Sequence, residues 1–257
     1  GFEGMNMLHE IITDMHNDAY NFGVRPLVIV AGGNSDCEEV WYPACFDEVL
    51  AVGAVDVYDK RGIWSGGAST YHSTIDIVAP GSLSKEDAGI DQVGIYTTFP
   101  TDVAQANLYH YTPIADQRSG TSLAAPHVSG VAALVLSQFP TLTNEQLRGR
   151  LVGTSDYIYD KNQAHLGLMG SGRLNAYRAL TEQEQPNLVL NGIQVDNVPT
   201  DNLEIGQPID VRLSLKNWWA NASNVWGLLS TNDHEVSIEY CGSDRITWGS
   251  IPTETSE

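Results

Sequence analysis

The stretch RSGTSLAAPHVSG, residues 118–130, runs from a small-residue turn directly into an apolar helical pattern. Its serine, Ser122, lies where a helix begins, beside unpaired backbone N–H groups and at the positive end of the helix dipole. Such N–H groups can hold an oxyanion, and Gly120 allows the chain to turn tightly just before them. Serine is also a favoured N-cap residue. The residues alone therefore leave two interpretations of Ser122 open, a helix cap and a nucleophile.

A histidine, His127, follows Ser122 five residues later in the same stretch. Five residues along an α-helix correspond to about 500° of rotation, which leaves the two side chains about 140° apart. We therefore expect His127 to point away from Ser122 and to belong to the scaffold of the helix rather than to act as its base.

Three continuous apolar runs precede this stretch and are typical of strands buried in a parallel sheet. They read PLVIVAGG at residues 26–33, EVLAVGAVD at 48–56 and IDIVAPG at 75–81. The polar and aromatic residues between Gly81 and Gly120 give no clear pattern. Together with flanking helices, the three runs predict a doubly wound α/β domain.

Helical patterns lie on both sides of the predicted strands. Residues 4–22 place apolar side chains near a 3.6-residue period, with Gly23 as a stop; these side chains are Met7, Leu8, Ile11, Ile12, Met15 and Tyr20. The helix that begins near Ser122 should end at about Phe139, before Pro140. Two shorter helices follow: TNEQLRGRL at 143–151, which opens with a capping box, and the end of SGRLNAYRAL at 171–180.

The composition changes at residues 181–186, and no helical period follows. In QPIDVRLSL, Ile209, Val211, Leu213 and Leu215 alternate with polar residues, as in a half-buried strand, and NVWGLLSTND and EVSIEY predict further strands. We therefore divide the chain into an α/β domain, residues 1–183, and a β-sandwich that is cut short, residues 184–257. Three tryptophans of this second part could bind a partner or fill the sandwich core, namely Trp218, Trp219 and Trp226.

The charge of the chain limits its partners. It carries 32 acidic and 13 basic residues, a net charge of −19, which argues against nucleic acid or an anionic membrane surface. No apolar run approaches the roughly 18 residues that a membrane-spanning helix needs. Because the chain opens with Gly1 and ends on IPTETSE, we expect it to be an internal piece of a longer protein. We expect that protein to be a monomer.

Three cysteines are present, without the spacing of a metal site. Cys37 and Cys45 are close enough in sequence for a disulfide, which would fit an oxidising compartment. Free thiols are the alternative, and the sequence does not decide between them.

Four ordered blocks resemble the subtilisin-like serine proteases, the subtilases. GTSLAAPHVSG is similar to their nucleophile segment, Gly-Thr-Ser-x-Ala-x-Pro-His-Val; VIVAGGNSD with YPACFDEVLAVGAVD, STIDIVAPG, and GSGRLNAYRAL resemble three further blocks. The resemblance covers roughly residues 5–180 and implies a partial subtilisin-like parallel sheet, with Ser122 as the nucleophile of a serine endopeptidase. The second part resembles the Ig-like modules of secreted bacterial proteases, which implies a secreted or cell-surface bacterial protein acting on proteins or peptides.

The resemblance also assigns two further residues. Asn34, in AGGN, matches the asparagine whose side chain donates to the oxyanion, with the Ser122 N–H as second donor; a turn asparagine is the alternative. Asp76 falls where some subtilases have an acid that helps to bind a weak cation, and oxygen ligands suit Ca²⁺ or Na⁺. Such a cation would be structural, and the chemistry requires no cofactor.

The remaining catalytic groups of the family are not found in this chain. A serine protease needs a histidine base and an aspartate that holds it, but neither His-Gly-Thr-His nor Asp-Ser/Thr-Gly occurs here. The histidines of the chain are His9, His16, His72, His110, His127, His165 and His234. In the family both partners precede the serine by more residues than this chain offers, so we expect them upstream of Gly1 and the chain alone to be inactive. The alternative is a pseudo-peptidase, or a secreted binding or adhesion module on the same scaffold.

Overall fold

The structure is a computed structural model that describes residues 2–17, 25–39, 41–64, 66–82, 95, 119–186, 188–196, 210–217, 219–227 and 246–251. The chain divides into two compact units, Gly1–Glu182 and Gln183–Glu257. This division falls one residue from the boundary that the change of composition indicates. In the described residues no helix has both the length and the apolar character needed to cross a membrane.

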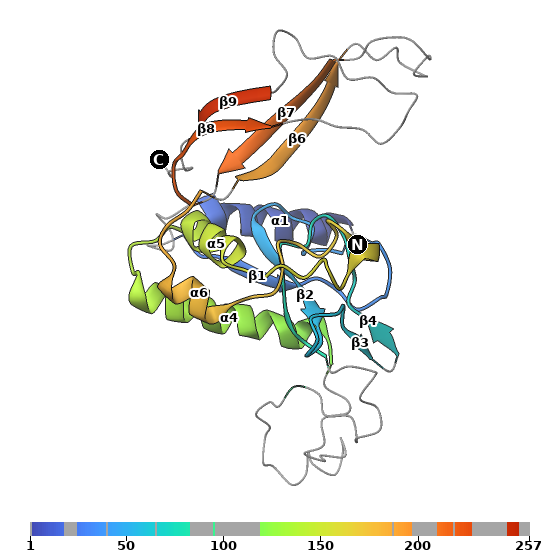
Figure 1. The fold of residues 1–257 in the computed structure, drawn as a ribbon. Coiled ribbons are helices and arrows are strands. Elements are labelled where there is room, and N and C mark those ends of the chain that lie inside the picture. The colour runs from blue at the N-terminus through green and yellow to red at the C-terminus, as the bar shows by residue number, and fades with distance from the viewer. Residues whose placement is uncertain are drawn as a thin grey trace, which may run out of the picture. The chain divides into compact units, whose positions relative to one another are not determined.

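A three-stranded parallel sheet forms the centre of the first unit (Figure 1). Its strands are β1 (Val28–Ala31), β2 (Val49–Val55) and β5 (Ile77–Pro80), in the order β1-β2-β5. They are the three apolar runs of the sequence, so the predicted parallel α/β sheet is confirmed. A small antiparallel pair, β3 (Ile63–Trp64) with β4 (Gly67–Ala68), lies between β2 and β5 in sequence.

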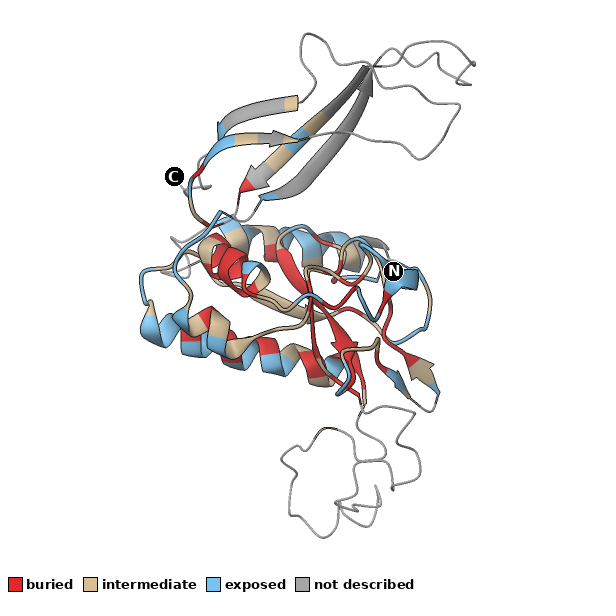
Figure 2. Cartoon of the chain, viewed as in Figure 1, coloured by how far each residue is buried: buried red, intermediate tan, exposed pale blue. Residues whose placement is uncertain are grey.

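Every residue of β2 is buried, as Figure 2 shows by its colour. Leu50, Val52 and Ala54 pack in one apolar cluster with α4, whereas Ala51 and Val55 belong to a second cluster that contains Ile158 and Met169. Parallel sheets need such cover on both faces, because neither face can be left in water. The continuous apolar sequence of β2 follows from this two-sided burial.

Helix α4 (Thr121–Gln138) covers one face of the sheet and contacts all three strands. Its buried side chains follow the helical period, at Ala124, Val128, Val131 and Val135. The predicted limits of this helix are confirmed, since it ends one residue before Phe139. Next come α5 (Asn144–Gly153) and α6 (Ala176–Thr181), with the 3₁₀ turn η2 (Gln163–His165) between them. The predicted capping box of α5 is present, with Thr143 and Gln146 each accepting from the other's backbone N–H.

Helix α1 (Phe2–Asn17) packs through a narrower stripe than the sequence suggested. Ile12 is buried with Phe46 and Val49, and Leu8 packs against that cluster. Met7 and Ile11 were expected in the stripe but are 59% and 47% exposed. Each precedes a stripe residue by one position, about 100° around the helix, which turns it out of the contact. Residues 18–24, with the predicted stop at Gly23, lie outside the described residues.

The second unit contains two antiparallel pairs of strands, β6 (Leu188–Asp196) with β7 (Asp210–Asn217) and β8 (Ala222–Gly227) with β9 (Ile246–Ile251). The expected strand around residue 211 is β7. Asn217 is buried and donates to the carbonyl of Ile251 at 3.0 Å. Trp219 is 2% exposed, so its side chain is buried. Trp218, the side chain of Trp226 and the predicted strand EVSIEY lie outside the described residues.

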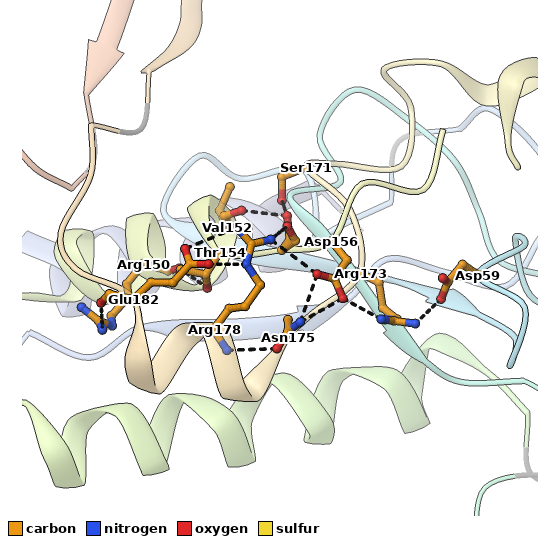
Figure 3. Close-up of polar contacts among 11 residues, drawn as sticks. Asp59, Arg150, Val152, Thr154, Asp156, Ser171, Arg173, Asn175, Arg178 and Glu182 are labelled. Carbon is orange, nitrogen blue, oxygen red and sulfur yellow. Dashed lines mark hydrogen bonds and ion pairs between the residues drawn. The ribbon is translucent and has the colours of Figure 1, made fainter. Parts of the chain in front are cut away.

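A network of ion pairs joins segments that are distant in sequence (Figure 3). Asp156 accepts from Arg173 at 2.6 Å, from Asn175 at 3.0 Å and from Arg178 at 3.4 Å. The second amino group of Arg173 donates to Asp59, which follows β2. Burial raises the pKa of Asp156, but the hydrogen bonds from Asn175 and Arg173 outweigh this and leave the pKa below its ordinary value.

A buried arginine connects the three helices α4, α5 and α6. Arg150 of α5 is 2% exposed, and its guanidinium lies 4.1 Å from the ring centre of Phe139, just after α4. It donates to the carbonyl of Ala179 in α6 at 2.5 Å and to that of Glu182 at 2.7 Å. Carbonyl oxygens and an aromatic face therefore help to compensate the buried charge.

We predict that Asp156→Asn lowers the free energy of unfolding by about 2 kcal/mol at neutral pH, because Arg173 and Arg178 each lose one of their two carboxylate partners. A carboxylate with a lowered pKa contributes stability above its unfolded pKa of about 3.9, and that contribution is lost as the pH falls through the folded pKa. The stability difference between wild type and variant should therefore narrow below about pH 4. Urea unfolding across pH 2.5–7, at roughly half-unit steps, measures this.

Asp160→Asn is the matched control, because Asp160 is exposed on the same segment. It should change stability by less than about 0.5 kcal/mol. An equal effect of both variants would contradict the role given to Asp156.

Candidate active site

The residues singled out by the sequence meet where strands end and a helix begins. Strand β1 ends at Ala31 and leads through two glycines to Asn34, and β5 is followed by Gly81. Helix α4 starts directly beside these ends, since the N–H of its N-cap residue Gly120 donates to the carbonyl of Gly81 at 2.8 Å. The site thus lies at the carboxyl ends of parallel strands, where open α/β sheets bind their ligands.

The backbones at this junction approach more closely than side chains would permit. A Cβ atom on Gly81 would lie 2.8 Å from the carbonyl oxygen of Gly120 and 2.7 Å from Cβ of Ala54. On the other side of the junction, Gly33 has φ +109°, a conformation that favours glycine. Glycine at these positions lets the strand ends and the helix start touch through their backbones.

Ser122 is exposed in the first turn of α4, and its hydroxyl does not cap the helix. The N-cap position is Gly120, and no side chain makes a capping hydrogen bond there. Within the described chain the Ser122 hydroxyl has no hydrogen-bond partner. The helix-cap interpretation is therefore wrong, and an exposed hydroxyl stands at the positive end of the helix dipole.

The backbone N–H of Ser122 has no acceptor among the described residues, unlike those of its neighbours in the first turn. Thr121 N donates to Asn34 Oδ1 at 2.9 Å, and the N–H groups of Leu123 and Ala124 both donate to the carbonyl of Gly120. In the described residues no acceptor faces the N–H of Ser122. This amide is available to an oxygen that approaches the hydroxyl.

The Asn34 amide lies beside Ser122. A Cβ atom placed on Gly120 would be 3.3 Å from Ser122 Oγ and 3.6 Å from both Nδ2 and Oδ1 of Asn34, so the hydroxyl and the amide border the same point. The atom of Asn34 that faces Thr121 N must be the oxygen, because a backbone N–H can only donate. Among the described residues nothing accepts from Nδ2. The site therefore presents two free N–H donors next to a free hydroxyl, which suits a developing oxyanion.

None of the described histidines makes a hydrogen bond to Ser122. His127 Nδ1 lies 2.8 Å from the carbonyl of Leu123 one turn back, and must donate to it, so that nitrogen cannot act as a base. His9, His16 and His72 contact Glu48, Glu145 and Thr74 respectively. The ring of His165 lies against that of Tyr71, with ring centres 4.3 Å apart, and its buried Nδ1 has no hydrogen-bond partner among the described residues. His110 and His234 lie outside the described residues.

Asp76 is held inside the first unit by Arg148 at 2.6 Å and by the N–H of Ala51 at 2.7 Å, one to each carboxylate oxygen. Burial raises the pKa of Asp76, against the lowering effect of Arg148. The positive charge beside the Asp76 carboxylate is that of the Arg148 guanidinium. In the described residues no cluster of three or more His, Cys, Asp or Glu side chains could hold a metal ion.

Both described cysteines, Cys37 and Cys45, are free thiols, which decides between the two alternatives that the sequence left open. Burial raises the pKa of each thiol, so both stay protonated near neutral pH. Cys241 lies outside the described residues.

One residue that sequence reasoning did not single out is Thr121. It is fully buried, and its hydroxyl contacts both Gly33 and Asn34. Its position between the glycine and the serine of GTS was the only signal available in the sequence.

The sequence was compared with protein families, with curated proteins and with solved structures. The sequence profile of the subtilase family of peptidases matches residues 4–188. Subtilisin DY of Bacillus licheniformis is 35% identical over 155 residues, covering 59% of this chain and 46% of the relative. M-protease of Shouchella clausii is 36% identical over 163 residues, covering 63% and 34%. A solved structure of a protease from Pseudoalteromonas arctica is 27% identical, with a TM-score of 0.45, covering 60% and 42%. The chain thus spans between about a third and about half of the length of these relatives.

The close approach at the junction predicts opposite effects for two glycine variants. Gly81→Ala should destabilise the chain by about 2 kcal/mol or more, because the new methyl group meets backbone that cannot move independently. Gly130→Ala, on α4 with nothing within 4 Å of its Cβ position, should stabilise it by about 0.5–1 kcal/mol. Thermal unfolding of both variants checks the pair, and a neutral Gly81→Ala would contradict the described contact.

Proposed function

Because the chain belongs to the subtilase family, we propose that it carries the nucleophile and the oxyanion-binding groups of a serine endopeptidase. Ser122 is the nucleophile, and the oxyanion is held by Asn34 Nδ2 and the backbone N–H of Ser122. The observation that carries this proposal is an exposed hydroxyl at the start of α4 beside two N–H donors, none of which has a partner among the described residues. Donors fixed in place before reaction stabilise a charge that develops only in the transition state.

In the proposed reaction, Ser122 Oγ attacks the carbonyl carbon of a peptide bond while its proton passes to a histidine. The C–N bond then breaks, the histidine gives the proton to the leaving amine, and an ester on Ser122 remains. Water hydrolyses this ester by the same path. These steps need no cofactor, and a cation bound near Asp76 would be structural.

We place the histidine, and the aspartate that orients it, in sequence upstream of residue 1. Two observations support this. The family strings for both residues are missing from the chain, and none of the described histidines makes a hydrogen bond to Ser122. Without a base a serine hydroxyl is a weak nucleophile, so the chain alone is proposed to be inactive.

The substrates we propose are proteins or peptides, and the protein is proposed to be a monomer that is secreted or held on a bacterial cell surface. The net charge of −19 supports neither nucleic acid nor an anionic membrane as a partner. For the second unit we propose an Ig-like β-sandwich module, supported by its two antiparallel strand pairs and by the burial of Trp219.

A fluorophosphonate probe, which labels activated serines, tests the division of the catalytic groups. We expect the chain of residues 1–257 to be labelled slowly, and a longer protein that includes the upstream sequence to be labelled rapidly and stoichiometrically at Ser122. Ser122→Ala should abolish labelling in both. Rapid labelling of the short chain would contradict its proposed inactivity, and an unlabelled long protein would favour the non-catalytic binding module.

In the longer protein, Asn34→Ala should lower kcat by about 10²–10³ with little change in KM, because its donor acts mainly on the transition state. This magnitude is carried over from the loss observed for such a donor in subtilisin itself. Glu38→Ala, on the same exposed loop, is the control and should leave kcat unchanged. A loss expressed only in KM would argue against the oxyanion role.

A further inference from the structure

We propose that Arg61 is a positioning residue, which through its ion pair with Asp36 holds the loop that carries Asn34. The inference rests on the proposed function, because Asn34 supplies the side-chain donor of the proposed oxyanion site. Arg61 follows β2, and its side chain is 11% exposed. The hydrogen bonds of that side chain go to Asp36 and Ser69. Any effect of Arg61 on the reaction therefore passes through the loop.

The loop that carries Asn34 rests on the segment at residues 68–71. The N–H of Thr70 donates to the carbonyl of Gly33 at 3.0 Å, and Thr70 Oγ1 accepts from the N–H of Ser35 at 3.2 Å. These two hydrogen bonds bracket Asn34, one on each side along the chain. The position of the Asn34 side chain therefore depends on how firmly the loop stays on this segment.

The guanidinium of Arg61 joins the loop to the same segment. One terminal nitrogen donates to Asp36 Oδ1 and the other to the carbonyl of Ser69, both at 2.7 Å. The guanidinium carbon lies 5.1 Å from the ring centre of Tyr71, and the backbone N–H of Arg61 donates to Asn162 Oδ1 at 2.8 Å. An exposed ion pair usually gains little because two mobile side chains must be ordered. Here the arginine is already held, so only the aspartate has to be ordered.

Asp36 depends on this partner because of its backbone conformation. Its φ is +54°, in the left-handed region that residues other than glycine rarely adopt. In this conformation its N–H donates to the carbonyl of Ala68 at 3.2 Å and its carboxylate reaches Arg61. Without the ion pair, other conformations of residue 36 gain population. Because Asn34 lies only two residues earlier, its amide then leaves Ser122 for part of the time.

Glycine at position 36 separates the backbone conformation from the ion pair. Glycine adopts positive φ without a side-chain penalty, so Asp36→Gly should keep the loop in place without Arg61. Asp36→Ala retains the penalty and lacks the partner. Arg61 should therefore be needed with aspartate at position 36 and dispensable with glycine there. If Arg61 served only to pack against Tyr71, its loss would have the same effect in both backgrounds.

Nuclear magnetic resonance of the 257-residue chain tests the positioning without any need for activity. In Arg61→Met, which keeps a long unbranched side chain, protection of the residue-36 amide from solvent exchange should fall about fivefold. The two Asn34 side-chain N–H signals should shift. In the Asp36→Gly background, Arg61→Met should change neither readout. Lys161→Met is the control, because it removes an exposed cation that donates to Asp59 at 3.1 Å, and it should resemble wild type.

Two outcomes of this experiment would overturn the proposal: unchanged signals in Arg61→Met, and equal changes in the aspartate and glycine backgrounds. If Arg61→Met does not fold, position 36 gives the same comparison at a side chain that is 57% exposed. Asp36→Ala should then lose protection of the residue-36 amide and Asp36→Gly should keep it. Equal protection in these two variants would contradict the role given to the ion pair.

Kinetics of the longer protein test the consequence for the reaction. Arg61→Met should lower kcat about fivefold with little change in KM, because fewer molecules hold Asn34 in place for the transition state. The same substitution should cost less than about twofold in the Asp36→Gly and Asn34→Ala backgrounds. A full loss in either background would overturn the proposal. If the longer wild-type protein proves inactive, the proposed function fails, whereas the magnetic resonance result still decides the role of Arg61.

Discussion

The hydrogen bond from the backbone N–H of Thr121 to Oδ1 of Asn34 joins the end of β1 to the start of α4, across 87 residues of sequence. It consumes one donor of the helix terminus and one acceptor of the loop. Within the part of the chain that the structure describes, the Ser122 N–H, the Ser122 hydroxyl and Asn34 Nδ2 remain without a partner. The chemistry of the site therefore depends on which polar groups are already hydrogen-bonded where β1 meets α4, because only the others can bind a substrate. The close approach of the strand ends to α4 depends on Gly81 and Gly120, since the Gly120 N–H donates to the Gly81 carbonyl at 2.8 Å.

Apolar packing positions the elements of this fold, and polar contacts orient individual side chains. Burial of each Val, Leu or Ile side chain contributes about 1.5–3 kcal/mol, against about 1 kcal/mol for an ordinary hydrogen bond. The position of α4 is thus set by its buried stripe against the sheet (Figure 2). The hydrogen bonds then decide how individual side chains are oriented. Arg150 and the Asp156 network hold the helices and turns that surround this core, at a distance in sequence from the site.

The sequence predicted those features that depend on local pattern. The three strands, the limits of α4 and the capping box of α5 each follow from neighbouring residues, so they could be recognised without the structure. The apolar stripe predicted for α1 was too wide, because the periodicity of apolar residues does not show which of them are buried against the rest of the protein. Ion pairs such as Asp59 with Arg173, 114 residues apart, depend on the finished fold. The meeting of Asn34 with Ser122 was implied only by the family resemblance, and the buried orientation of Thr121 had no signal in the sequence.

A crystal structure of the longer protein with a phosphonate bound to Ser122 tests the central claim most directly. The account predicts that one phosphonate oxygen lies about 2.7–3.1 Å from both Asn34 Nδ2 and the backbone N–H of Ser122. Asn34 Oδ1 should still accept from Thr121 in that structure. An adduct whose oxygens avoid both donors, or an Asn34 amide turned away from the serine, would contradict it.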